Sequence, residues 1–143
     1  MSKTIITCDS GMDPINTDYM VSAILNRNDT KTYRDVTEIT SEEVLAEIKN
    51  GFSFKTSAAT PEDYYNLFNR ALDNCDNIIH LSMGEGLSRA SLNTAFFVSQ
   101  EIARDKITVL DAKNGATGGT LILEYAKYLE NCGLSYREIL EEL

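Results

Sequence analysis

The sequence predicts an α/β fold: a single three-layer domain with a central, mainly parallel sheet and helices on both faces. Short, continuous apolar runs alternate along the chain with amphipathic segments that carry helix start signals. This alternation is typical of a parallel sheet whose two faces are both covered by helices. The chain has 143 residues, of which 43% are hydrophobic, which is enough for one domain with a core of its own. We therefore expect one domain over residues 1–143.

The first third of the chain is expected to form two strands, a hairpin and a helix. Residues 4–8 are a β-branched run that ends in a turn-forming segment, and residues 19–25 have the composition of a second strand. A polar turn follows at residues 26–29, and residues 31–36 are expected to return beside the second strand as a hairpin. Thr40 and the acidic residues after it predict a helix that runs to Lys49 and ends at Asn50-Gly51.

The remaining two thirds alternate between helices and buried strands. Thr60-Pro61 is a strong helix start, because it combines a hydroxyl cap with proline at the first helical position. Residues 77–81 and 106–110 are short apolar runs typical of buried strands. We expect further helices over residues 87–102, 117–129 and 135–140.

Hydroxyl residues and glycines lie where strands give way to helices, at residues 55–61 and 81–89. Such junctions offer unpaired backbone N–H groups and the positive end of a helix dipole, which together can hold an anionic group. In parallel sheets, ligands bind outside the carboxyl ends of the strands, where Asp9 and Ser10 are also expected. The sequence therefore predicts a site for the anionic head of a small ligand, to which the Arg89 guanidinium could be attracted.

Composition excludes several other classes of protein. The net charge of −9 argues against nucleic acid and anionic membranes as partners, because these need a basic face. No apolar run approaches the roughly 18 residues of a membrane span, and no signal peptide is visible at the N-terminus, so a cytoplasmic location is expected. The spacing of the three cysteines fits neither a metal site nor a disulfide framework.

Catalysis is not expected either. The chain has one histidine, His80, and shows no Cys/His or Ser/His/Asp arrangement that would activate a nucleophile. Gly84 and Gly86 lack the third glycine of a dinucleotide-binding turn, which would fall at Arg89. We therefore predict a binding protein without cofactor or metal.

Several motifs together resemble the DegV family. They are Thr7-Cys8-Asp9-Ser10, Tyr33-Arg34-Asp35 with Ile39-Thr40, Lys55-Thr56-Ser57, Ser82-Met83 with Gly86-Leu87-Ser88, and Val109-Leu110-Asp111-Ala112-Lys113 before a Gly-containing helix start. The resemblance implies a bacterial carrier of long-chain fatty acids that presents the acid to a separate fatty-acid kinase. It also implies two α/β domains, of which residues 1–143 would be the N-terminal one, with the second family domain absent from this chain.

Carried over to this sequence, the resemblance implies Thr56, Ser57 and Ser88 as ligands of the carboxylate, with Gly86 giving backbone access. Asp9, Ser10 and Arg89 are secondary candidates. From the residues alone, Ser88 could instead be a helix N-cap.

Two other functions remain open from the sequence. The chain could be a phosphocarrier, such as a sugar-phosphotransferase subunit, with His80 as phosphoryl acceptor, or a regulatory interaction module without a ligand. Without a second domain to cover the acyl tail, we also expect an apolar patch that favours self-association.

Overall fold

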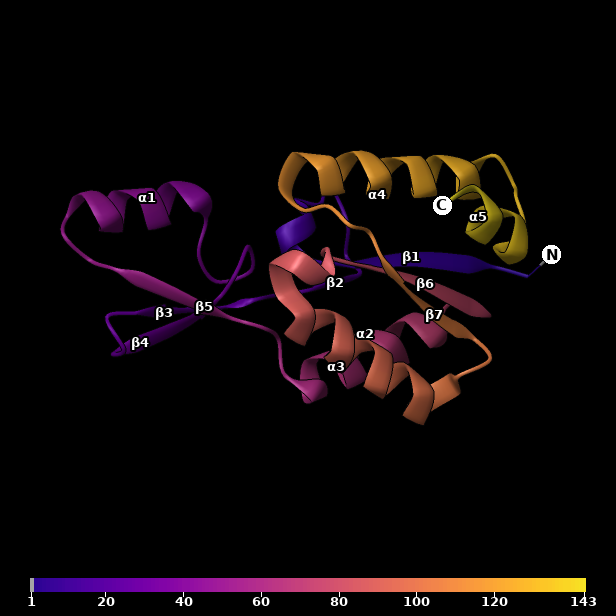
Figure 1. Cartoon of the computed structure of the whole chain (residues 1–143), viewed down its shortest axis with the longest axis horizontal. Coiled ribbons are helices and arrows are strands. Elements are labelled where there is room, and N and C mark those ends of the chain that lie inside the picture. Colours follow the sequence, from indigo (N-terminus) through magenta and orange to yellow (C-terminus); the bar gives the residue numbers. More distant parts are fainter. Residues whose placement is uncertain (1) are drawn as a thin grey trace.

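The computed structural model describes residues 2–143, and its centre is a parallel sheet of four strands (Figure 1). The strands lie in the order β2-β1-β6-β7, and each neighbouring pair is parallel. Their bounds are Thr4–Asp9 for β1, Met20–Val21 for β2, Asn77–Ser82 for β6 and Ile107–Asp111 for β7. The predicted fold class, a parallel sheet between two helical layers, is confirmed.

Helices cover both faces of this sheet (Figure 1). One face carries α2 (Pro61–Leu72) and α3 (Glu85–Ala103), and the other carries α4 (Ala116–Asn131) and α5 (Tyr136–Glu142), with the short 3-10 helix η1 (Ser10–Met12) beside α4. The start of α2 is the one expected: the Thr60 hydroxyl accepts from the Asp63 N–H, and the Asp63 carboxylate accepts from the Thr60 N–H.

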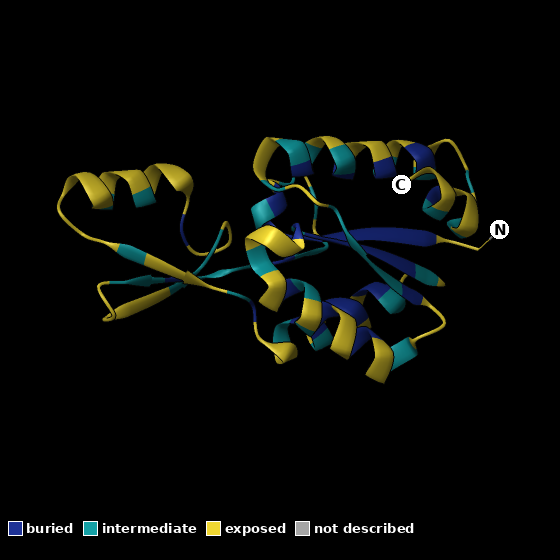
Figure 2. Ribbon diagram, in the orientation of Figure 1, coloured by how far each residue is buried: buried dark blue, intermediate teal, exposed yellow. Residues whose placement is uncertain are grey.

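The sheet separates two hydrophobic cores, because successive side chains of a strand point to opposite faces. Ile5 packs towards α2 and α3 with Phe68 and Ile78, whereas Ile6 packs towards α4 and α5 with Leu123. Every residue of β1 is buried, so the strand is dark blue throughout in Figure 2. We call the parallel sheet with α2 to α5 the body.

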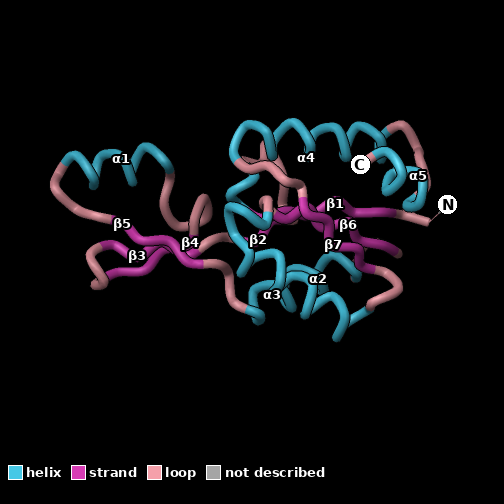
Figure 3. Tube along the Cα trace, viewed as in Figure 1, coloured by secondary structure: helices cyan, strands magenta, loops and turns pink. Residues whose placement is uncertain are grey.

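A second, antiparallel sheet extends away from the body (Figure 3). Its strands lie in the order β4-β3-β5, with bounds Ile24–Arg27 for β3, Lys31–Arg34 for β4 and Phe54–Ser57 for β5. The helix α1 (Ser41–Lys49) lies between β4 and β5 in the chain and has no buried residue. We call β3, β4, α1 and β5 the arm.

The arm corrects one prediction. Residues 19–25 do not form one strand, because the chain passes from one sheet to the other at Ala23. The Ala23 N–H donates to the Ser10 hydroxyl over 3.0 Å, and its carbonyl accepts from the Asp35 N–H over 2.9 Å. The hairpin was predicted correctly, with Asn28 and Asp29 at positive φ in its turn. The third strand of the antiparallel sheet, β5, ends at the strand-to-helix junction predicted at residues 55–61, although no bounds were predicted for this strand.

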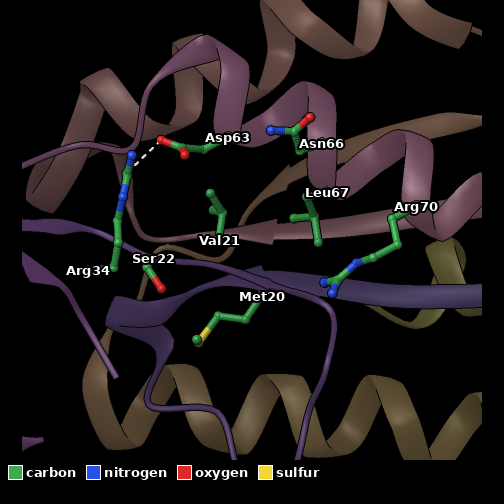
Figure 4. Close-up of a pocket in the computed structure, with 8 residues that line it drawn as sticks. All are labelled: Met20, Val21, Ser22, Arg34, Asp63, Asn66, Leu67 and Arg70. Carbon is green, nitrogen blue, oxygen red and sulfur yellow. Dashed lines mark hydrogen bonds and ion pairs between the residues drawn. The ribbon is translucent and has the colours of Figure 1, made fainter. Parts of the chain in front are cut away.

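Where the arm meets the body, a hollow of about 300 Å³ lies between β2, β4 and α2 (Figure 4). Arg34 at the end of β4 donates to the carboxylate of Asp63 on α2 over 2.7 Å. Burial alone would raise the pKa of Asp63, but hydrogen bonds from Thr60 and Arg34 outweigh it and lower this pKa. This ion pair ties the arm to the body.

Candidate functional site

A cleft of about 510 Å³ lies between the end of β5 and the first turns of α3. Arm and body both line it. Its lining residues are Ala23, Thr56, Ser57, Ala58, Met83, Leu87, Ser88, Arg89, Ala90 and Ser91. Four of the predicted site residues, from segments about thirty positions apart in the chain, therefore meet in one cleft: Thr56, Ser57, Ser88 and Arg89.

The arm supplies Thr56 and Ser57. They are the last two residues of β5, where Thr56 pairs with Leu25 and Ser57 with Ile24 of β3. Both residues are exposed and line the cleft. The antiparallel pairing thus places two hydroxyl residues at the cleft edge.

Ser88 interrupts α3 rather than continuing it. Its backbone is not helical (φ −149°, ψ 80°), and its hydroxyl accepts from the Ser91 N–H over 3.4 Å. Ser88 therefore caps the longer part of α3, as the N-cap interpretation expected. The same kink leaves Ser88 among the residues that line the cleft, so its role as a ligand of a carboxylate stays a prediction.

Arg89 and Gly86 are placed differently. The Arg89 guanidinium pairs with the Glu85 carboxylate over 3.0 Å, and both side chains are largely exposed, at 72% and 51%. An exposed pair of this kind is worth little, so Arg89 can turn towards an anion in the cleft. Gly86 lies in the first turn of α3, outside the lining residues, and a Cβ there would meet no atom within 4 Å. Its ligand role stays a prediction.

Asp9 is buried, at 4% exposure, and accepts from the backbone of Met83, which lines the cleft. One carboxylate oxygen accepts from the Tyr64 hydroxyl over 2.8 Å and lies 3.3 Å from His80 Nε2. The other accepts from the Ser82 hydroxyl over 2.8 Å and from the Met83 N–H over 3.0 Å. Asp9 thus joins β1, β6, α2 and the loop that leads into α3.

These donors keep Asp9 ionised. Burial would raise the pKa of Asp9, but the hydrogen bond from His80, the charge of His80 and the donors Met83 and Ser82 outweigh it and lower this pKa. Because every donor comes from the protein itself, Asp9 holds the backbone of Met83, a residue of the cleft lining, in place. Ser10 is also buried, and its hydroxyl accepts from the Ala23 N–H. Whether either residue touches a ligand stays a prediction.

His80 lies deep in the body with no exposed surface. Its Nδ1 lies 2.8 Å from the Thr7 hydroxyl, and the rings of Tyr64 and Phe68 pack against it edge-on. A phosphoryl acceptor must be reached by its donor, so this burial weighs against the phosphocarrier interpretation.

Sequence reasoning did not single out two residues near the cleft, Ser91 and Tyr64. Ser91 lies 2.8 Å from Ser88 between the two hydroxyl oxygens, and the Tyr64 hydroxyl donates to Asp9 over 2.8 Å. Tyr64 lies on the buried face of α2, with Leu67 and Phe68. The signal was its hydroxyl, because a tyrosine in a core stripe usually has a polar partner there.

Two absences hold for residues 2–143. No helix in this range is both long and apolar enough to cross a membrane. Nor does this range contain a group of three or more histidine, cysteine, aspartate or glutamate side chains arranged to hold a metal ion.

Solved structures of similar fold are named for fatty-acid binding. One, described as fatty acid binding of a DegV family protein from Thermus thermophilus, superposes with a TM-score of 0.84 at 26% identity, over 98% of this chain and 51% of the other. A stearic acid-binding protein from Eubacterium ventriosum gives a TM-score of 0.84 at 21% identity, over 99% of this chain and 51% of the other. A fatty acid kinase B3 protein of Streptococcus pneumoniae, loaded with linoleic acid, gives a TM-score of 0.78 at 23% identity, over 99% of this chain and 53% of the other.

Sequence comparison gives the same relationship. A DegV domain-containing protein of Staphylococcus aureus (strain MRSA252) is 28% identical over an alignment 149 residues long, which covers 100% of this chain and 52% of the relative. The chain thus spans about half the length of such relatives. The family model described as "Uncharacterised protein, DegV family COG1307" matches residues 14–143. With the fold and motif order in agreement, this match over most of the chain shows that it belongs to the DegV family.

Proposed function

We propose that this chain is a non-catalytic carrier domain that binds a long-chain fatty acid and presents its carboxyl group to a partner kinase. The observation that carries the proposal is the convergence of Thr56, Ser57 and Ser88 on one cleft. Hydroxyl groups from two separate elements suit a carboxyl group, which has two oxygens to satisfy. The DegV relatives named for fatty-acid binding support this choice of ligand.

The chemistry of the cleft favours holding a ligand over converting it. Its lining consists of hydroxyl, small and apolar side chains with one arginine, whereas acyl transfer needs an activated nucleophile or base. His80, the one histidine, is fully buried, with its Nε2 3.3 Å from Asp9. The kinase as partner rests on the family resemblance and on the similar fold of the fatty acid kinase B3 protein.

The mouth of the cleft is the place for the acyl tail. Leu87 lines the cleft and is 68% exposed, so a tail that leaves the cleft here meets apolar surface on only one side. Each methylene left in water forfeits about 0.8 kcal/mol. We therefore expect the 143-residue chain alone to bind long-chain fatty acids weakly and to self-associate. A tight, monomeric one-to-one complex in native mass spectra would contradict this.

Ser88 provides the direct test. A hydrogen bond to a charged group is worth about 1.5–3 kcal/mol, so Ser88→Ala should weaken fatty-acid binding about tenfold to a hundredfold. Ser88→Thr keeps the hydroxyl and most of the capping, and should keep the affinity. Binding is measured by titration well below the melting temperature and corrected for the folded fraction, because loss of the cap alone costs about 1 kcal/mol of stability. Equal affinity in all three proteins would overturn the proposed site.

A further inference from the structure

The parallel sheet of the body has two edges, and only one of them is a strand of full length. β2, at one edge, has two residues, after which the chain passes to the arm. β7, at the other edge, has five residues and is paired on one side, with β6 (Figure 1). A very short edge strand is protected from other chains, whereas a longer apolar one is a template for a further strand. β7 is therefore the edge at which another strand can be added.

The backbone of β7 alternates between β6 and the open side of the sheet. The Lys106 carbonyl accepts a hydrogen bond from β6, and the Ala112 N–H donates one to β6. Because successive residues of a strand direct their N–H and C=O groups to opposite sides, the residues that face away from β6 are Ile107, Val109 and Asp111. In the described part of the chain, residues 2–143, their backbone groups have no hydrogen-bond partner.

The sequence of β7 does not protect this edge. Native proteins protect edge strands with lysines, prolines or bulges, but residues 107–110 contain neither lysine nor proline and their register with β6 is unbroken. The whole chain has a net charge of −9, yet the segment from Asp105 to Lys113 is neutral, because its two aspartates are balanced by its two lysines. Two copies of this edge can therefore approach each other without the repulsion expected between acidic proteins.

The helix α3 adds a second uncharged surface beside the edge. It packs against β6 and β7, and its residues 90–100 include no charged side chain. Phe96 and Phe97 in this stretch are 56% and 55% exposed. Exposed apolar surface of this kind marks protein interfaces when it is contiguous. β7 and α3 together thus offer an uncharged, partly apolar face on an acidic chain.

We propose that two copies of this chain pair through β7, antiparallel and about a two-fold axis at Val109, so that their parallel sheets join into one. In this register Val109 lies opposite Val109 of the second copy, and Ile107 lies opposite Asp111 of the second copy. Residues that face each other in this way exchange both of their hydrogen bonds, so every free N–H and C=O group of the edge gains a partner. A shift of two residues would place Ile107 or Asp111 opposite a residue outside the strand.

The same register is complementary in charge. Asp105 precedes β7 and Lys113 follows it, and both residues are exposed. The two-fold axis brings Asp105 of each copy to the end of the paired strands at which the other copy has Lys113. Opposite charges across paired strands stabilise the pair, whereas like charges destabilise it. Because the edge is complementary to itself in both hydrogen bonds and charge, we assign a second copy of this chain as its occupant.

Pairing through β7 leaves both clefts open. No residue of β7 lines the cleft, and the antiparallel arrangement directs the carboxyl ends of the two parallel sheets in opposite directions. The two clefts therefore lie at opposite ends of the joined sheet, where each is accessible to its own partner. The inference requires no ligand, so its test is independent of the proposed function.

Amide hydrogen exchange of the 143-residue chain, followed by NMR at low and high protein concentration, tests the pairing. In the dilute monomer the N–H groups of Ile107, Val109 and Asp111 should exchange fast, whereas those of Thr108 and Leu110 are protected by β6. Where sedimentation equilibrium shows a dimer, exchange of the three outward amides should slow by about tenfold or more. A chain that stays monomeric up to roughly 1 mM, or a dimer in which these amides still exchange fast, would overturn the inference.

Charge reversal at the ends of β7 distinguishes this interface from any other surface. Asp105→Lys or Lys113→Asp alone places like charges together and should weaken the dimer about threefold to thirtyfold. The double variant restores opposite charges and should regain the wild-type dissociation constant. Lys31→Asp in β4 is the matched control, because it changes the net charge as Lys113→Asp does but lies on the arm, away from β7 (Figure 1). A double variant that dimerises no better than the single ones, or a control that weakens the dimer equally, would contradict the proposed register.

Discussion

The body and the arm of this protein differ in what holds them together. The body has two cores on opposite faces of a parallel sheet, with side chains such as Phe68 and Leu123 fully buried. The arm contributes to neither core, and α1 has no buried residue although it carries Leu45 and Ile48. Yet the arm supplies Thr56 and Ser57 to the cleft. The cleft therefore joins a body with two cores to an arm that belongs to neither.

This difference bears on how a ligand would be held in the cleft. Segments with few buried apolar contacts open at low free energy, and ligand-binding elements are drawn from them. Ser88 is fixed in α3 by its capping bond, whereas Thr56 and Ser57 lie on a short, exposed strand. A ligand that touches both sides would order the arm against the body, and its affinity would include the cost of that ordering.

The largest effect should come from matched leucines in the two regions. Leu123→Ala in α4 empties a fully buried position and should lower the free energy of unfolding by about 2–5 kcal/mol. Leu45→Ala in α1 truncates a side chain that is 58% exposed. It should change the free energy of unfolding by less than about 0.5 kcal/mol. Urea denaturation of both variants gives the comparison, and similar losses would show that the arm has a core of its own.

The second comparison concerns buried and exposed charge. Asp9→Asn leaves buried donors without their acceptor and should cost about 1–3 kcal/mol, whereas Lys55→Ala removes an exposed partner of Asp29 (72% and 69% exposed) and should cost almost nothing. Because the pKa of Asp9 is lowered by folding, its stabilisation is fully present above the unfolded value of 3.8 and is lost as the pH falls below it.

Unfolding free energies measured from neutral to acid pH test whether the stabilisation by Asp9 is lost as the pH falls. Wild type should lose stability in acid more steeply than Asp9→Asn, because the variant has no proton to take up at this position. Lys55→Ala should follow the wild-type profile. Parallel profiles for wild type and Asp9→Asn would mean that Asp9 has the same pKa in the folded and unfolded chain.

The sequence predicted the body better than the arm, for a physical reason. Apolar runs such as residues 77–81 and the Thr60-Pro61 helix start are local signals that the packed structure reinforces. The end of β5 is visible as the strand-to-helix junction at residues 55–61, but its bounds are not, because the strand is mostly exposed and lacks alternation of apolar and polar residues. The break at Ala23 depends on hydrogen bonds to Ser10 and Asp35, which no local pattern contains.

The candidate site shows the same division. Thr56, Ser57 and Ser88 could be found because hydroxyls at strand-to-helix junctions are visible in the sequence. Ser91 and Tyr64 could not, because one resembles any polar helix residue and the other a core aromatic. Tyr64 of α2 and Ser91 of α3 line one small cavity because α2 packs against α3.

Helix caps give a third, smaller comparison. Thr60 and Thr40 form the same capping box, at the start of α2 in the body and of α1 in the arm. Thr60→Ala should lower the free energy of global unfolding by about 1 kcal/mol, because α2 is packed into the core. Thr40→Ala should leave global unfolding nearly unchanged and speed hydrogen exchange within α1. Equal losses of global stability would show that the arm unfolds together with the body.

The smallest effect concerns the ion pair between the arm and the body. Arg34 and Asp63 are 36% and 22% exposed, so their ion pair is partly screened by water and should contribute about 0.2–1 kcal/mol. Arg34→Ala should therefore barely change global stability, but it removes the ion pair that ties β4 to α2. Hydrogen exchange of β3, β4 and β5 should become faster while that of β1 and β6 is unchanged. Lys31→Ala, at the other end of β4, is the control and should leave these rates as in wild type. If Arg34→Ala changes neither set of rates, the arm is held to the body by its packing at Ala23 rather than by this ion pair.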